Sequence, residues 1–174
     1  TMIKADLQKA FNAQINEELY SAYLYVSMVN YFEGQNLKGF ATWMRAQVVE
    51  ELTHASKFIA YLNERGGEVK LEAIAKPDAT WKSPLAAFEA AYKHECHISA
   101  CINELYAQAA KAGDNAAAIF LNWFINEQVE EEASADEVVQ NLKLAQGAPG
   151  ALFMLDRELG TRVPAITVNT PAAE

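Results

Sequence analysis

The stretch VVEELTHASKF, residues 48–58, puts Glu51 and His54 on the same helical face as large apolar residues. Steps of three and four residues follow one side of an α-helix, and such steps join Met44, Gln47, Glu51, His54 and Phe58. A helix at the surface of a protein keeps charged groups on its solvent side. The pattern therefore indicates a helix whose polar groups point into the protein.

Similar interruptions occur in three other segments with helical periodicity. Each segment carries an apolar stripe with steps of three and four residues, as packed helices require. The stripe of the last segment is read as Ala117, Phe120, Phe124, Glu127, Glu131, Ser134, Val138 and Leu142. The other interruptions are Glu18 and Glu95. Because each lies near the middle of its helix, antiparallel packing brings all of these groups to one level.

Sparse glycine and proline residues separate the predicted helices. Four long helices and a short fifth one are expected at residues 5–33, 38–65, 84–111, 114–145 and 149–160. The long connection before Ser83-Pro84 allows the second and third helices to run parallel. The sequence thus predicts an all-α four-helix bundle with one long crossover, formed by residues 1–160. Residues 161–174 are predicted to be a flexible tail.

Several carboxylates inside one bundle are expected to need neutralisation. Burial of one carboxylate costs several kcal/mol, against a domain stability of roughly 5–15 kcal/mol. No lysine or arginine interrupts the four stripes. Protonation or bound cations therefore remain as the means of neutralisation.

The donor types indicate which cation would bind. Carboxylate oxygens with one imidazole and no thiolate favour iron, with manganese second. Glu51 is central enough to bridge two ions. Glu18 and His54 would complete the site of one ion, and Glu95 and Glu131 that of the other.

Four motifs together resemble the non-haem ferritins of bacteria and archaea. They are NEELYSAYLY at 16–25, VEELTHASKF at 49–58, YKHE at 92–95 and NWFINEQVEEE at 122–132. The resemblance covers nearly the whole chain and implies a ferritin-like bundle. It also implies a hollow shell of about two dozen subunits that oxidises iron(II) with dioxygen or hydrogen peroxide and stores iron(III) mineral inside.

The resemblance also implies roles for individual residues. The first iron position matches Glu18, Glu51 and His54; the second matches Glu51, Glu95 and Glu131, with Gln128 nearby; a third, weaker position matches Glu50, Glu127, Glu130 and Glu131. Tyr25 and Trp123 match aromatic residues beside the iron pair that can lend electrons to oxygen. Core packing is the alternative role for Trp123.

The sequence differs from two related families, the bacterioferritins and the rubrerythrins, in residues that those families use to bind metal or haem. The fourth helix carries Glu127-Gln128-Val129-Glu130 and so lacks the second Glu-x-x-His of bacterioferritins and rubrerythrins. Leu52 stands where bacterioferritins bear the methionine that binds haem, so no haem is expected. The two cysteines are too few for the cysteine-rich iron domain of a rubrerythrin.

Composition restricts the partners and the compartment. The chain has 174 residues, a net charge of −9 and a pI near 4.9. This acidity argues against nucleic acid or an anionic membrane as a partner and favours cations. With neither a signal-peptide pattern nor a membrane-spanning run, the cytoplasm is the expected compartment. Cys96 and Cys101 are expected to be buried or half-buried core residues without a disulfide.

Two other functions remain open at this point. One is a diiron enzyme that acts on a small substrate such as peroxide without storing iron. The other is a metal buffer or helical scaffold in which the buried acids are protonated. A small oligomer without mineral would favour the former, and the absence of stoichiometric iron(II) binding would favour the latter.

Overall fold

The computed structural model of the protein describes residues 2–165 and contains five helices. They are α1 (Ala5–Gly34), α2 (Lys38–Glu64), α3 (Pro84–Lys111), α4 (Asn115–Leu144) and α5 (Pro149–Leu159). Each boundary lies within one residue of its predicted position. The predicted all-α four-helix bundle with a short fifth helix is confirmed.

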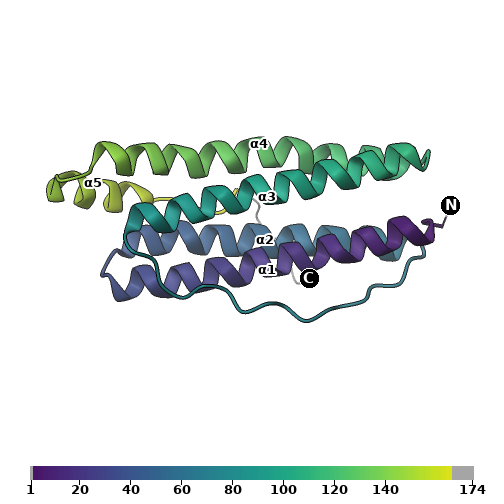
Figure 1. Ribbon diagram of the computed structural model, residues 1–174, viewed down its shortest axis with the longest axis horizontal. Coiled ribbons are helices and arrows are strands. Elements are labelled where there is room, and N and C mark those ends of the chain that lie inside the picture. The colour runs from purple at the N-terminus through teal and green to yellow at the C-terminus, as the bar shows by residue number, and fades with distance from the viewer. Residues whose placement is uncertain (1, 166–174) are drawn as a thin grey trace, which may run out of the picture.

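The four long helices form two antiparallel hairpins that pack side by side (Figure 1). A short turn joins α1 to α2, and another joins α3 to α4. The connection at residues 65–83 runs along the whole bundle, so that α2 and α3 are parallel (Figure 1). The positive φ of 67° at Gly66 lets the backbone leave α2 at the start of this connection.

Helix α5 folds back against the start of α2. One carboxylate oxygen of Asp156 accepts hydrogen bonds from the backbone N–H groups of Gly39 (2.8 Å) and Phe40 (3.1 Å). These groups lie in the first turn of α2, where no side chain of the helix itself forms a cap. A Cβ atom at Gly39 would lie 1.5 Å from the Asp156 carbonyl oxygen, so only glycine permits this approach.

The core consists of two apolar clusters with polar side chains between them. One cluster is centred on Phe32, Phe40 and Phe88, and the other on Phe11, Phe58 and Phe124. The buried polar residues are Gln14, Glu18, Ser21, Gln47, Glu50, Glu51, His54, Glu95, Ser99, Gln128 and Glu131. The predicted interruptions at Glu18, Glu51, His54, Glu95 and Glu131 are therefore buried at the middle of the bundle.

The predicted stripe of α4 is partly wrong. The buried face is Ala117, Leu121, Phe124, Gln128, Glu131, Ala135, Val138, Val139 and Leu142. Phe120, Glu127 and Ser134 lie at its edge and are only half-buried. The predicted and the observed face share Ala117, Phe124, Glu131, Val138 and Leu142, and a period of 3.6 residues accommodates both series of steps. Only packing against α3 decides that Gln128 points inward in place of Glu127.

None of the helices within residues 2–165 combines the length and the apolar character needed to cross a bilayer. The predicted flexible tail divides into two parts. Residues 166–174 lie outside the described part of the chain. Residues 161–165 run back from α5 toward the middle of the bundle (Figure 1), where Arg162 reaches a buried carboxylate.

Candidate metal centre

Glu18 of α1 meets Glu51 and His54 of α2 at the middle of the bundle. All three are at most 1% exposed, and one donor atom from each lies within 4.8 Å of the other two. The His54 Nδ1 atom is 3.4 Å from Glu51 Oε2 and 3.7 Å from Glu18 Oε2. Because Glu51 and His54 are one helical turn apart, the geometry of α2 holds them side by side.

Several buried atoms of this group make no hydrogen bond. Within residues 2–165, neither carboxylate oxygen of Glu51 accepts a hydrogen bond, and neither does Glu18 Oε2. His54 Nε2 likewise has no hydrogen-bond partner there. Buried polar atoms are nearly always hydrogen-bonded, because an unpaired one costs about 1–3 kcal/mol. An unpaired carboxylate beside an imidazole is instead suited to hold a divalent cation.

Glu95 of α3 is a further fully buried carboxylate, and its charge adds to burial in raising the pKa of Glu51. The buried Tyr25 hydroxyl donates a hydrogen bond to Glu95 Oε1, and Gln128 Nε2 donates one to Oε2 at 3.2 Å. Burial raises the pKa of Glu95, while these two hydrogen bonds oppose the increase. Burial, together with the charge of Glu95, also raises the pKa of Tyr25, so the phenol remains a hydrogen-bond donor.

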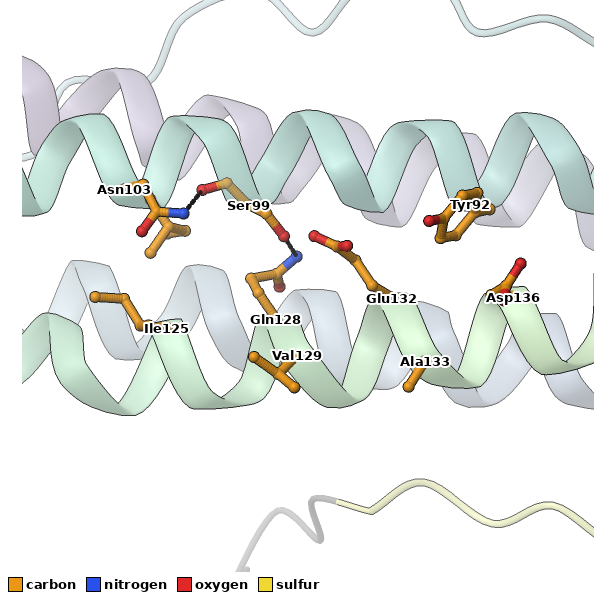
Figure 2. Close-up of a pocket in the computed structure, with 10 residues that line it drawn as sticks. Tyr92, Ser99, Asn103, Ile125, Gln128, Val129, Glu132, Ala133 and Asp136 are labelled. Atoms are coloured by element: carbon orange, nitrogen blue, oxygen red, sulfur yellow. Dashed lines mark hydrogen bonds between the residues drawn. The ribbon is translucent and has the colours of Figure 1, made fainter.

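Gln128 lines a groove between α3 and α4 (Figure 2). The groove has a volume of about 370 Å³, and Glu132 and Asp136 also line it. Figure 2 shows the Gln128 amide directed across the groove toward Ser99 of α3, at 3.4 Å. Gln128 therefore contacts both the Glu95 carboxylate and the acidic groove.

Glu131 of α4 completes the buried carboxylates. It is 5% exposed and accepts a hydrogen bond from Gln47 Nε2 at 2.9 Å. Burial, followed by the charges of Glu95 and Glu50, raises the pKa of Glu131 to about 8. Without a cation, this carboxyl group is therefore largely protonated at neutral pH.

Burial and neighbouring charged groups also shift the pKa values of Glu51 and His54. Burial and the charge of Glu95 raise the pKa of Glu51 well above its usual value, although His54 opposes them. For His54, burial lowers the pKa, but the nearby Glu18 and Glu51 carboxylates outweigh it and raise the pKa overall. The metal-free centre thus retains protons that entering cations can replace.

The residues predicted for a third position are only partly brought together. Glu127 Oε1 is 4.0 Å from His54 Nε2, and His54, Glu127 and Glu131 offer donors within 4.8 Å of one another. Burial raises the pKa of Glu127, and the charges of Glu130 and Glu50 add to the increase. Glu130 itself is exposed and joins none of the donor groups found within residues 2–165.

Glu50 has a basic partner that the sequence analysis did not identify. Arg162 Nη2 lies 2.7 Å from Glu50 Oε2, and the backbone N–H of Ala165 donates to Oε1 at 2.6 Å. The Arg162 guanidinium also covers the Trp43 ring, 4.1 Å from its centroid. No basic residue interrupts the apolar stripes of the four long helices. Arg162, which follows the last helix, supplies a positive charge at the middle of the bundle instead.

Trp123 lies at the rim of the centre and not in the core. It is 36% exposed, and its ring meets that of His54 edge to face, with centroids 5.6 Å apart. The Lys57 Nζ atom lies over the Trp123 ring, 4.1 Å from its centroid. Tyr25, by contrast, is fully buried.

Three supporting residues were not among the predicted site residues. Gln14 donates to Glu18 Oε1 at 2.8 Å, Gln47 donates to Glu131, and Arg162 binds Glu50. Gln14 and Gln47 precede Glu18 and Glu51 by four residues each and so lie on the same helical faces. This spacing could have predicted that both glutamines support the site. Arg162 follows the last helix and belongs to no periodic pattern.

Comparisons with known proteins agree with this geometry. The family model described as a ferritin-like domain matches residues 8–145. A bacterial non-heme ferritin of Bacteroides fragilis is 42% identical over 161 residues, which are 92% of this chain and 100% of the relative. One of Campylobacter jejuni is 36% identical over 156 residues, 90% of this chain and 93% of the relative.

Solved structures give the same match. An open-pore ferritin from the hyperthermophilic archaeon Archaeoglobus fulgidus superimposes with a TM-score of 0.91 at 49% identity, covering 92% of this chain and 99% of that chain. A closed form engineered from the same ferritin gives a TM-score of 0.92 at 49% identity, with coverages of 93% and 99%.

Proposed function

Because the chain belongs to the ferritin-like family and is similar along its length to iron-storage ferritins, we propose that its buried centre oxidises the iron(II) that is then stored. Glu18, Glu51 and His54 would bind one iron(II) ion as substrate. Glu51, Glu95 and Glu131 would bind a second, with Glu51 shared between the two.

The observation that carries this proposal is the state of Glu51. Both of its oxygens are buried without a hydrogen bond from any residue in the described chain. Glu18 and His54 offer donor atoms within 4.8 Å of it, and burial, followed by the charge of Glu95, raises its pKa. A carboxylate between two donor sets is the arrangement that a pair of bridged cations requires.

The residues around the centre would allow it to hold both iron(II) and iron(III). Glu51, Glu131 and His54 would release protons as cations bind, which limits the change in net charge inside the bundle. Tyr25 and Gln128 would fix the orientation of Glu95 through their hydrogen bonds. The two apolar clusters on either side would limit the access of water.

Electrons balance if iron is oxidised in pairs. Two iron(II) ions release two electrons, which with two protons reduce dioxygen to hydrogen peroxide, or hydrogen peroxide to water. If only one iron(II) ion is bound, Tyr25, which lies against Glu95, would supply the second electron and its phenolic proton. The iron(III) product then leaves for storage.

The test is rapid mixing of anaerobic iron(II)-loaded protein with dioxygen. Glu51→Ala and His54→Ala are expected to abolish fast oxidation while leaving the helix content unchanged. Glu89→Gln is the matched control, because Glu89 is an exposed carboxylate of α3. Wild-type oxidation rates in both centre variants would exclude the assignment.

We further propose a third, weaker iron position made by Glu50, Glu127, Glu130 and Glu131. Its support is the pKa of Glu127, which burial and the charges of Glu130 and Glu50 raise, and the approach of Glu127 to His54. Because Arg162 already neutralises Glu50, this position should bind iron more weakly than the other two. Anaerobic calorimetry with iron(II) tests this order of affinities.

We also propose that the chain assembles into a hollow shell of about two dozen copies in the cytoplasm. Its likeness along 92% of its length to a ferritin described as having an open pore supports the assembly. Two free thiols, Cys96 and Cys101, fit a reducing compartment. Electron microscopy of iron-loaded protein should show hollow particles with dense centres, whereas a small oligomer without mineral would indicate a diiron enzyme without storage.

A further inference from the structure

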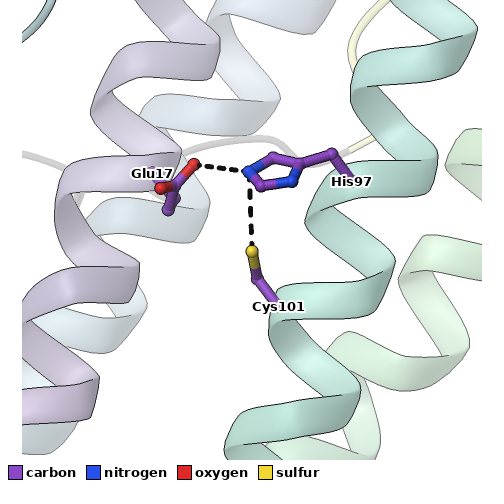
Figure 3. A group of neighbouring side chains, drawn as sticks. All are labelled: Glu17, His97 and Cys101. Carbon is purple, nitrogen blue, oxygen red and sulfur yellow. Dashed lines mark hydrogen bonds and ion pairs between the residues drawn. The ribbon is translucent and has the colours of Figure 1, made fainter.

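Three different metal-binding side chains meet on the face between α1 and α3 (Figure 3). Glu17 comes from α1, and His97 and Cys101 come from successive turns of α3. Figure 3 shows the His97 ring between the other two groups, with Nε2 3.1 Å from Glu17 Oε2 and 3.6 Å from Cys101 Sγ. One donor atom from each of the three residues lies within 4.8 Å of the others.

These distances fit a tetrahedral cation. Metal–ligand bonds of about 2.0–2.3 Å at tetrahedral angles separate nitrogen from sulfur by about 3.6 Å and nitrogen from oxygen by about 3.4 Å. The nitrogen–sulfur distance in this group is 3.6 Å, and the nitrogen–oxygen distance is 3.1 Å. The carboxylate oxygen and the sulfur lie within 4.8 Å of each other, and a shift of about an ångström at most in one exposed side chain would bring them to the tetrahedral separation of about 3.6 Å.

The group is separate from the buried centre. Glu17 and Glu18 are adjacent in α1 but point to different sides, since Glu18 is 1% exposed and the Glu17 side chain is 37% exposed. An open pocket of about 440 Å³ borders Glu17, His97 and Cys101. A cation could therefore bind from solvent without passing through the bundle.

We propose that Glu17, His97 and Cys101 form a surface site for a borderline divalent cation of the zinc(II) type, with the fourth position open to water. The donors are one carboxylate oxygen, one neutral imidazole nitrogen and one thiolate sulfur. The Cys101 thiol gives its proton to solvent as the metal–sulfur bond forms, and no electron is transferred. The site does not depend on iron oxidation at the buried centre.

The donor types determine which cation is preferred. A thiolate with an imidazole favours zinc(II) over iron(II), as does the general order of stability for divalent ions. The buried centre offers carboxylates with one imidazole and no thiolate. The two sites therefore differ in chemical class, and their occupancies should be separable.

Cobalt(II) is the appropriate probe, because a thiolate ligand gives it a charge-transfer absorption that carboxylate and imidazole sites do not produce. The assembled wild-type protein is titrated anaerobically with cobalt(II), and one thiolate-bound ion per chain is expected. Cys101→Ser and His97→Ala should abolish the absorption or weaken binding at least about tenfold, in the range seen when support for a metal site is lost. Zinc(II) should displace the cobalt(II) signal in the wild type.

The second cysteine provides the matched control. Cys96 is also a half-buried thiol of α3 but belongs to no donor group within the described residues, so Cys96→Ser should retain the full absorption. The proposal is overturned if the wild type shows no thiolate absorption, or if the signal persists in Cys101→Ser. Iron(II) oxidation by Cys101→Ser should equal that of the wild type, so the outcome is independent of the proposed ferroxidase function.

Discussion

The Arg162 guanidinium lies 2.7 Å from the Glu50 carboxylate, so a residue beyond the last helix neutralises an acid at the middle of the bundle. Glu50 is 1% exposed, whereas the Arg162 side chain is 20% exposed. The contact joins the segment after α5 to the carboxylates proposed for the third iron position. A positive charge at this point should influence both stability and cation binding.

Replacement of Arg162 tests this contact. Arg162→Met is expected to lower the stability of the metal-free protein by about 1–3 kcal/mol, because Glu50 remains buried without its partner. It should also tighten iron(II) binding at the third position, since a cation no longer competes with arginine. Thermal unfolding and anaerobic calorimetry measure the two effects. Arg157→Met, on the exposed side of α5, is the control, and equal behaviour of the two variants would contradict the prediction.

Removal of the Glu51 carboxylate should separate stability from function. Glu51→Leu is expected to raise the stability of the metal-free protein by about 1–2 kcal/mol, because an unpaired buried polar group is replaced by an apolar one. The same variant should lose fast iron(II) oxidation. Thermal unfolding in the presence of a chelator, together with oxygen-uptake kinetics, provides the measurement. A metal-free Glu51→Leu protein less stable than the wild type would show that the carboxylate makes favourable contacts without metal.

The pH dependence of stability follows from Glu131. Its pKa rises from 4.5 to about 8 in the folded protein, so the folded state holds a proton that the unfolded state has lost over this interval. The stabilisation is complete below about pH 4.5 and is lost as the pH rises through about 8, a change on the order of a few kcal/mol at most. The unfolding temperature of the metal-free protein should therefore decrease as the pH rises from about 4.5 to about 8. Glu131→Gln should reduce the decrease, and a pH-independent difference between the two proteins would contradict the assignment.

Tyr25 provides a test of the support around Glu95. Tyr25→Phe removes the hydroxyl that donates to Glu95 Oε1 and should lower stability by about 1–2 kcal/mol. Iron(II) should still bind, because no proposed ligand is lost, but any tyrosyl radical formed during oxidation should disappear from the electron paramagnetic resonance spectrum. Tyr23→Phe is the control, since Tyr23 is 48% exposed on the same helix. A radical of equal size in Tyr25→Phe would assign the electron to another residue.

Asp156 links α5 to α2 and should control the position of the segment that bears Arg162. Asp156→Ala removes the acceptor for the Gly39 and Phe40 N–H groups and is expected to cost about 1–2 kcal/mol. Hydrogen exchange should increase in α5 and in the first turn of α2, with little change in α3. Glu158→Ala, an exposed change in the same helix, should leave exchange unaltered. Equal exchange in the two variants would show that apolar packing alone holds α5.

Much of the buried centre could be predicted from single helices. Glu18, Glu51, His54 and Glu95 each interrupt an apolar stripe near the middle of a helix, and all four are buried between the two apolar clusters. Periodicity was less reliable in α4, where the series through Glu127 and the series through Gln128 both fit a helix. The structure buries Gln128 and leaves Glu127 at the edge, since contact with α3 selects the face.

The helices, the long crossover and the level at which the acids gather could be predicted from the sequence, because helical periodicity and the positions of glycine and proline are local properties. The partner of each acid became known from the folded chain alone. Arg162 reaches Glu50 across 112 positions of sequence, and Glu17 of α1 meets His97 of α3 across 80. Such pairings depend on where the folded chain returns in space, and no periodic signal along one helix records that.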